Sequence, residues 1–234
     1  MLKLGIMQPY FFPYIGYWQL ISAVDHYIIY DDVNFIKSGW VNRNNILLNN
    51  KAHLIRLHLN QASYLKKINE IEIEDNPIRM RKILATLKQG YAKAPYFNPT
   101  MILLERIFNY SEKNLASFNL NHIKEICNYL EINTKLTLSS SIKQNSTLKG
   151  KDRVIEICRE NKTDIYINAI GGKNLYNKEE FEKNGITLKF IKSRNIEYKQ
   201  FKNNNFVPWL SIIDIMMFND KKEIRSMLSK YELL

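Results

Sequence analysis

A dense aromatic and polar cluster near the amino terminus holds the groups of this sequence best suited to ligand binding. It runs Gln8-Pro9-Tyr10-Phe11-Phe12-Pro13-Tyr14-Ile15-Gly16-Tyr17. Two prolines stiffen it, Gly16 lets a ligand or another backbone come close, and the tyrosines carry hydroxyls on apolar rings. We therefore predict that Gln8, Tyr10, Gly16 and Tyr17 contact a ligand and that Tyr14 takes part in chemistry. A buried aromatic turn that only packs is the alternative.

Two adjacent carboxylates, Asp31 and Asp32, follow the next apolar run. Neighbouring side chains of an extended segment point to opposite faces, so one can face the aromatic cluster while the other caps a turn. A carboxylate there could act as a general base or accept a hydrogen bond from an amine. We predict Asp32, with Asp31 second, as the proton acceptor. The spacing of the histidines and carboxylates predicts no metal site.

Basic and aromatic side chains form a second cluster at Lys37, Trp40, Asn42 and Arg43. Arginine offers two parallel donors to a phosphate, lysine a point charge, and tryptophan a face on which a base or sugar can stack. These four residues would suit a nucleotide-linked ligand. The alternative is a hairpin with a solvated tip.

The carboxyl-terminal half supplies further binding candidates. Gly171-Gly172-Lys173 is a glycine loop after a predicted strand, where backbone amides could hold an anion, although a simple turn reads the same way. Tyr198 is a single candidate. Asp214 lies in an apolar helix and needs a partner if it is buried.

The pattern of apolar residues predicts an α/β fold. Lys3–Met7 reads as a short strand, Tyr14–Ala23 as a helix and His26–Tyr30 as a second strand, which is a compact start for a parallel sheet. We also expect strands at Val33–Ile36, Ala52–Leu59, Asp164–Asn168 and Thr187–Ile191. Residues 61–147 predict a mainly helical insertion within one domain, 1–234.

Composition narrows the classes of protein. The chain has 234 residues and a formal charge of +11, but the positive charge is spread along it without a polybasic arm. No apolar run approaches the ~20 residues that span a bilayer, so we expect no membrane partner. Cys127 and Cys158 lack metal-site spacing and read as reduced, buried thiols of a cytoplasmic protein.

These motifs together resemble the WbqC-like family. The similarity rests on Gln8–Tyr17, Ala23–Asp25, Tyr30–Phe35 and Trp40–Ile46, and extends to Leu210-Ser211-Ile212-Ile213-Asp214. The resemblance implies an accessory protein of bacterial surface-polysaccharide gene clusters, such as those for O-antigen and lipopolysaccharide. One departure is Ala169-Ile170-Gly171-Gly172, where family members often show a Ser-Gly pair.

A more distant likeness links Tyr14-Ile15-Gly16-Tyr17 to the His-x-Gly-His signature of nucleotidyltransferase-like or Rossmann-like α/β folds. That likeness implies a parallel-containing sheet. Both histidines are tyrosines here, and a phenol has no cationic form to stabilise a triphosphate. The sequence therefore identifies no cofactor and gives no support for ATP chemistry.

We predict an enzyme that transfers an acyl or aminoacyl group to the amine of a nucleotide-linked amino sugar. The donor stays open among an adenylate, a thioester and an aminoacyl-tRNA, and nucleic acid is expected only in that last role. One rival is a non-catalytic module that binds a sugar nucleotide or a partner enzyme. An RNA-binding protein is the other, although basic and aromatic residues do not interleave as a stacking platform requires.

Overall fold

The computed structural model describes residues 1–142, 147–201 and 205–234. A six-stranded sheet forms its centre, in the order β10-β9-β8-β1-β2-β7. Its strands are β1 (Lys3–Met7), β2 (His26–Ile29), β7 (Lys135–Leu138), β8 (Ile165–Ala169), β9 (Thr187–Ser193) and β10 (Tyr231–Leu233). All neighbouring pairs are parallel except β9 with β10. The predicted parallel-containing α/β sheet is confirmed.

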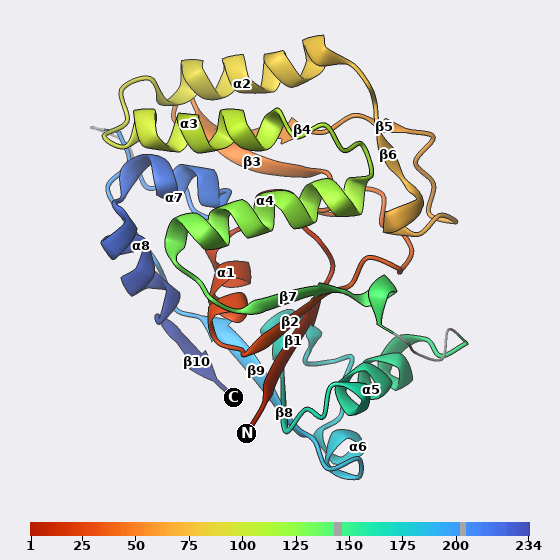
Figure 1. Ribbon diagram of the computed structural model, residues 1–234. Coiled ribbons are helices and arrows are strands. Elements are labelled where there is room, and N and C mark those ends of the chain that lie inside the picture. Colours follow the sequence, from red (N-terminus) through yellow and green to blue (C-terminus); the bar gives the residue numbers. More distant parts are fainter. Residues whose placement is uncertain (143–146, 202–204) are drawn as a thin grey trace.

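Helices cover both faces of the sheet, and Figure 1 shows α2, α3, α4 and α7 on one side with α5 and α6 on the other. The α-helices are α1 (Ile15–Ser22), α2 (Pro77–Tyr91), α3 (Phe97–Phe108), α4 (Leu115–Leu130), α5 (Gly150–Glu160), α6 (Lys178–Glu182), α7 (Ile212–Phe218) and α8 (Lys221–Leu228). Short 3-10 turns lie at η1 (Ile68–Glu70), η2 (Ser139–Ser141) and η3 (Ile170–Gly172). None of the helices in the described ranges is long and apolar enough to cross a bilayer.

The β1–α1–β2 unit forms as the apolar pattern predicts. Pro9, two residues beyond the end of β1, has no backbone N–H for a ladder, and Pro13 stands just before α1. Gly5 lies under the ring of Tyr27, where an added Cβ would come within 3.0 Å of Cδ2. The close contact lets the two buried strands pair in register, from Leu4 opposite His26 to Met7 opposite Ile29.

The segment between β2 and β7 is mainly helical, as predicted, through α2, α3 and α4. It also contains the short strands β5 (Leu59–Asn60) and β6 (Glu72–Ile73), and residues 143–146 of the predicted insertion lie outside the described ranges. One continuous apolar core joins these helices to α1, α7 and α8. This continuity supports our proposal that residues 61–147 are an insertion within a single domain.

Two predicted strands differ from the structure. Val33–Ile36 is irregular apart from a single bridge between Asn34 and Lys67. The other strand, β4, covers Lys51–Arg56 and pairs with β3 (Arg43–Leu48). Asn49 and Asn50 both adopt positive φ, 51° and 62°, which gives the tight two-residue turn that hairpins favour. Arg43 therefore lies in a strand and not at a solvated tip.

Candidate functional site

The strand order places a crossover point between β1 and β8. From β1 the chain adds β2 and β7 on one side, and then returns through α5 to add β8 and β9 on the other. Beyond the carboxyl ends of β1 and β8 the connections therefore leave in opposite directions. In open α/β sheets this divergence creates the crevice where ligands bind.

A pocket of about 270 Å³ occupies this position. Five predicted site residues line it together, namely Tyr10, Tyr14, Gly16, Tyr17 and Trp40. The other lining residues are Met7, Pro13, Asn44, Ala169 and Trp209. Met7 ends β1 and Ala169 ends β8, so the floor of this pocket is the crossover point itself.

Aromatic rings form the rim. The Trp209 ring lies 5.1 Å from the Tyr14 ring and is 70 % exposed, while Trp40 is 43 % exposed on the same pocket. Trp209 also adopts φ of 62°, a left-handed conformation that costs a non-glycine residue roughly 1–3 kcal/mol. A strained backbone that holds a large apolar ring in solvent is typical of a ligand-binding residue, because neither feature stabilises the fold.

The loop between β1 and α1 is fixed by side chains that donate to its backbone carbonyls. Asn44 Nδ2 donates to the carbonyl oxygens of Phe11 at 3.1 Å and Phe12 at 2.9 Å, and Ser211 Oγ donates to Phe12 at 2.7 Å. Three further pairs complete the set: Tyr17 with Gln8, Asn119 with Pro9, and Trp18 with Pro13. Phe12 itself has φ of 43°. The pocket wall is therefore held in place before any ligand arrives.

His122 supports the same loop from α4. Its ring stacks on Phe12, with centroids 4.6 Å apart, and its Nε2 accepts a hydrogen bond from the Phe12 backbone N–H at 3.5 Å. Burial lowers the pKa of His122 to about 3, so the imidazole is neutral at physiological pH and can accept this bond. In the structure His122 positions this loop.

The pocket lining is uncharged within the described residues. Burial raises the pKa of the Tyr10 phenol, and also that of Tyr14, where a contact with the Ser193 side chain partly offsets the effect. The pKa of Tyr17 is raised well above its usual value by burial. All three are therefore neutral hydrogen-bonding groups at pH 7. Such a pocket suits a flat, polar-edged ring such as a nucleobase better than a phosphate.

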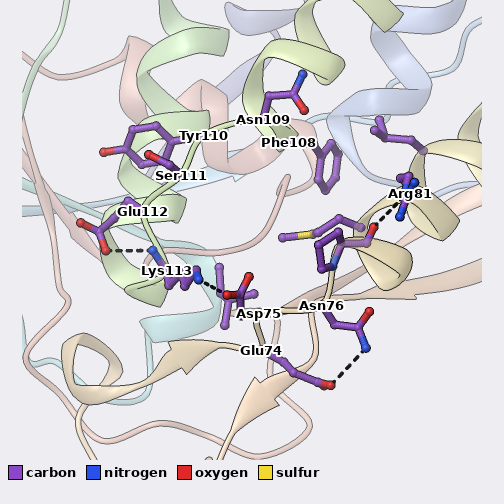
Figure 2. A pocket seen from close by; sticks show the side chains of 14 residues that line it. Glu74, Asp75, Asn76, Arg81, Phe108, Asn109, Tyr110, Ser111, Glu112 and Lys113 are labelled. Carbon is purple, nitrogen blue, oxygen red and sulfur yellow. Dashed lines mark hydrogen bonds and ion pairs between the residues drawn. The ribbon is translucent and has the colours of Figure 1, made fainter.

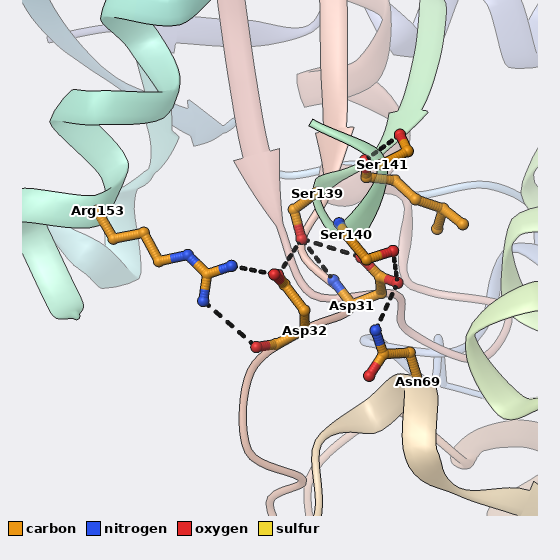
Figure 3. A network of polar contacts seen from close by, with 8 residues as sticks. Asp31, Asp32, Asn69, Ser139, Ser140, Ser141 and Arg153 are labelled. Carbon is orange, nitrogen blue, oxygen red and sulfur yellow. Dashed lines mark hydrogen bonds and ion pairs between the residues drawn. The ribbon is translucent and has the colours of Figure 1, made fainter. Parts of the chain in front are cut away.

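The two predicted carboxylates lie at the same edge of the sheet, beyond β2, but outside this pocket lining (Figure 3). Asp31 is buried and accepts hydrogen bonds from Ser139 Oγ, Ser140 N, Ser140 Oγ and Asn69 Nδ2. With four donors it joins the end of β2 to η2 and to η1. Its geometry is that of a carboxylate that ties turns together.

Asp32 lies in a bend after β2 and has a charged neighbour of its own. Its carboxylate forms an ion pair with Arg153 of α5, and Arg153 Nη1 also donates to the Asp32 backbone carbonyl at 3.3 Å (Figure 3). Ser139 Oγ contacts Asp32 Oδ1 as well as Asp31 Oδ1. A hydroxyl carries one proton and can donate to only one of them at a time. Asp32 therefore lies between the Ser139 hydroxyl and the Arg153 guanidinium.

The second predicted cluster is divided by the structure. Only Trp40 reaches the pocket. Arg43 donates to the carbonyls of Ser38 and Gly39 and so stabilises its own turn, while Asn42 Nδ2 donates to the Leu57 carbonyl at 2.9 Å. Lys37 is exposed. Arg43 belongs to the β3–β4 hairpin. Its side chain and that of Asn42 therefore bind backbone carbonyls of the protein instead of reaching the pocket.

The glycine loop forms the short turn η3. An added Cβ at Gly172 would lie 2.5 Å from Asn168 Nδ2, so the close approach is to the protein's own side chain, whereas Gly171 faces open space. Neither glycine lines the pocket, although Ala169 just before them does.

Asp214 is fully buried in α7 and receives three hydrogen bonds. Tyr91 Oη donates at 2.7 Å, Tyr198 Oη at 2.5 Å and Gln200 Nε2 at 2.8 Å. Burial raises the pKa of Asp214, and these three donors partly offset the rise. Asp214 thus has the partners that a buried carboxylate needs. These bonds connect α2, α7 and the segment that precedes α7, and neither Tyr198 nor Asp214 lines the pocket.

A larger cavity of about 540 Å³ lies between the start of α2 and the α3–α4 connection (Figure 2). Its charged residues pair with one another or with backbone: Lys113 with Asp75, Glu74 with Arg79, and Arg81 with the Pro77 carbonyl. The Asn76 side chain caps α2 by accepting from Ile78 and Arg79. The charged side chains of this cavity are therefore already engaged within the protein.

Metal and thiol chemistry find little support. No group of three or more histidine, cysteine or carboxylate side chains in the described ranges is placed to hold a metal ion. Cys127 and Cys158 are free, buried thiols, and burial raises the pKa of each to about 12, which keeps them protonated.

The sequence could have revealed some of the residues that were missed. Asn44 and Ser211 stand inside the motifs used for the resemblance, and their short polar side chains suit carbonyl contacts. Trp209 follows Pro208 directly before the Leu210–Asp214 segment, so a tryptophan in a proline turn was the available signal. Its contact with Tyr14 is long-range and has no pattern in the sequence.

The structure thus defines an open-sheet α/β protein with an aromatic pocket at its crossover point. The chain belongs to the WbqC-like protein family, whose model matches residues 8–226. It is 27 % identical over 220 residues to the "Uncharacterized protein Rv1507c" of Mycobacterium tuberculosis, a match that covers 92 % of this chain and 93 % of that protein. No solved structure matches the chain.

Proposed function

We propose that this chain binds a nucleotide-linked amino sugar at the carboxyl edge of its sheet and transfers an acyl or aminoacyl group to the sugar amine. The observation that carries the proposal is the exposed, strained Trp209 beside Tyr14 over an uncharged aromatic pocket at the crossover point. A nucleobase stacked on aromatic rings is worth roughly 1–3 kcal/mol per base, with no need for a charge.

The size of the pocket supports a division of the ligand. A volume of about 270 Å³ suits the base with part of its ribose but not a whole sugar nucleotide. The diphosphate and sugar would then extend along the strand ends from β1 toward β2. The Tyr30 N–H bonds the Met7 carbonyl at 2.8 Å there, so the segment that leads to Asp32 leaves β2 beside the end of β1.

In the proposed reaction the amine nitrogen attacks the donor carbonyl carbon. A C–N bond forms, the bond from carbon to the leaving group breaks, and the leaving group takes the electron pair. Asp32 accepts the proton that the amine loses and passes it to the leaving group. Asp31 is the weaker candidate because four donors already occupy its oxygens.

The family resemblance supports a place in bacterial surface-glycan synthesis, in the cytoplasm. A specific observation also favours a second candidate, a non-catalytic sugar-nucleotide-binding module, because no charged side chain among the described residues lines the aromatic pocket. The two candidates share the ligand and differ in turnover.

The test incubates the protein with UDP- or dTDP-linked amino sugars and, in turn, a thioester, a carboxylic acid with ATP, and charged tRNA. Mass spectrometry of the sugar nucleotide should show an added acyl mass with one donor, and Asp32→Asn should abolish it. Tight binding of the sugar nucleotide without product from any donor class would establish the binding module. Failure of every sugar nucleotide to bind would reject both candidates.

A further inference from the structure

A surface patch beside the pocket is apolar at its centre and basic at its edge. Phe35 N donates to the Lys66 carbonyl at 2.9 Å, and Asn34 bridges Lys67 in antiparallel fashion. Ile36 and Lys37 directly follow this contact on one segment, and Tyr64 and Leu65 directly precede it on the other. We call Ile36, Tyr64 and Leu65, with Lys37, Lys66 and Lys67 around them, the Ile36–Leu65 patch.

The apolar side chains of this patch are strongly exposed, Leu65 at 74 %, Tyr64 at 63 % and Ile36 at 55 %. Exposed apolar groups gathered in one place, with polar residues around them, mark an interaction site. None of the three lysines forms an ion pair within the described ranges, whereas Lys88, Lys113 and Lys151 do. The patch thus keeps its positive charge unpaired.

The patch also connects to the pocket. The carbonyl of Ile36 accepts a hydrogen bond from Gly39 N at 3.0 Å, and Arg43 donates to the Gly39 carbonyl of the same turn. Trp40 ends this turn and lines the pocket, and its carbonyl accepts a hydrogen bond from Phe11 N at 2.8 Å. A partner on the patch would therefore sit beside the ring of Trp40.

We infer that the Ile36–Leu65 patch docks an acidic carrier protein, which delivers the acyl group as a thioester on a flexible arm. The inference rests on the proposed function and names its donor. Unpaired lysines attract an acidic surface and orient it, and the aliphatic centre fits the apolar face of a partner helix.

Two other occupants fit less well. An RNA would find phosphate contacts at the lysines but only one stacking face, Tyr64, and it would leave the aliphatic side chains of Ile36 and Leu65 without an apolar partner. A second copy of the chain would bring the same three lysines against each other, in a protein that already carries +11.

The probe is a purified bacterial acyl carrier protein whose arm bears an acetyl thioester, with binding followed by fluorescence anisotropy. We expect saturable binding that weakens as salt rises. Leu65→Ser with Ile36→Ser, and separately Lys66→Glu with Lys67→Glu, should each lower affinity at least tenfold. Ile102→Ser, an equally exposed apolar site on α3, and Lys183→Glu with Lys222→Glu should leave it unchanged.

The inference is overturned if the carrier protein does not bind, or if the patch and control variants bind alike. It is also overturned if tRNA binds with dependence on Lys66 and Lys67 alone, or if sedimentation shows a dimer that Leu65→Ser dissociates. Titration of a UDP-linked amino sugar separates this from the proposed function, because the patch variants should bind the sugar nucleotide as the wild type does. If the wild type itself does not bind the sugar nucleotide, the proposed function is rejected instead.

Discussion

At the residue scale, the site separates side chains that face a ligand from side chains that hold the pocket in shape. Trp209, Tyr14 and Trp40 offer rings to the cavity. Asn44 and Ser211 also lie in motif segments, but their side chains donate hydrogen bonds to carbonyls of the loop between β1 and α1. Replacing a side chain that faces the ligand should lower affinity and leave the stability of the fold unchanged. Replacing a side chain that holds the loop should lower both.

Trp209→Gly tests the strained rim directly. Glycine adopts φ of 62° without strain, so the melting temperature should stay equal or rise, while affinity for the sugar nucleotide should fall by roughly 1–3 kcal/mol, the worth of one stacked base. Isothermal titration and thermal melting measure the two effects. Tyr110→Ala, at another exposed aromatic residue, is the control and should bind normally. Unchanged affinity in Trp209→Gly would remove Trp209 from the site.

Gly16→Ala asks whether the ligand approaches the start of α1. A Cβ there meets only ordinary contacts, 3.5 Å from the Tyr14 ring and 3.8 Å from Ser193 Cβ, so the protein should fold and gain up to about 1 kcal/mol in helix stability. The new methyl group nevertheless enters the pocket, and binding should weaken about tenfold or more. Gly171→Ala, whose Cβ meets open space, should bind as the wild type does. Equal affinities for both would place the ligand elsewhere.

At the element scale, the loop between β1 and α1 depends on support from β3, α4 and the start of α7. This dependence explains what the sequence could and could not predict. Alternation and proline positions are local, so β1, α1, β2 and the helical middle follow from the pattern. Partners such as His122 with Phe12 or Ser211 with Phe12 are 110 and 199 residues apart in the chain, and no spacing predicts them.

Two asparagines of one hairpin region give a matched comparison of that support. Asn44→Ala leaves the buried carbonyl of Phe11 without its side-chain donor and that of Phe12 with Ser211 alone, and it should cost roughly 1–3 kcal/mol of unfolding free energy, together with ligand affinity. Asn42→Ala loses one partly buried bond to Leu57 and should cost less, with binding retained. Urea unfolding and titration of both variants decide. Loss of binding in Asn42→Ala alone would return Asn42 to the ligand site that the sequence suggested.

His122 predicts how stability depends on acid. Its pKa is lowered from 6.5 to about 3 by burial, so the unfolded chain binds a proton between these values that the folded chain does not. The stability it contributes is therefore present above pH 6.5 and is lost as pH falls toward 3, by up to about 1.4 kcal/mol per pH unit. The difference between wild type and His122→Asn in urea unfolding should shrink across this range. A difference between wild type and His122→Asn that stays flat across this range would contradict the buried neutral ring.

At the scale of the whole molecule, the Asp214 cluster joins the insertion helices to the carboxyl-terminal part. Tyr91 of α2 donates to Asp214 of α7 and accepts from Leu47 N of β3 at 2.8 Å. The need of Asp214 for a partner could be foreseen, but its donor Tyr91 lies 123 residues away and has no pattern in the sequence that would predict the contact. The same holds for the pocket: its place at the crossover point required the order of β1 and β8 in the sheet.

Asp214 has the opposite pH signature to His122. Burial raises its pKa above 3.8, so the folded state binds the proton more tightly than the unfolded chain. Its contribution to stability is full below pH 3.8 and is lost as pH rises through the folded pKa. The unfolding free energy of wild type relative to Asp214→Asn should therefore decline from pH 4 upward in urea titrations. A relative stability that increases with pH would show that the hydrogen bonds of Tyr91, Tyr198 and Gln200 outweigh burial.

The central claim is that the aromatic pocket at the end of β1 and β8 binds the nucleotide part of a sugar nucleotide. The most direct measurement is a crystal structure of the protein soaked with a UDP-linked or dTDP-linked amino sugar. We predict density for the base against Tyr14 and Trp209, with the sugar directed toward Asp32. A base bound in the cavity of Figure 2, or an aromatic pocket left empty while the ligand binds another surface, would contradict the account.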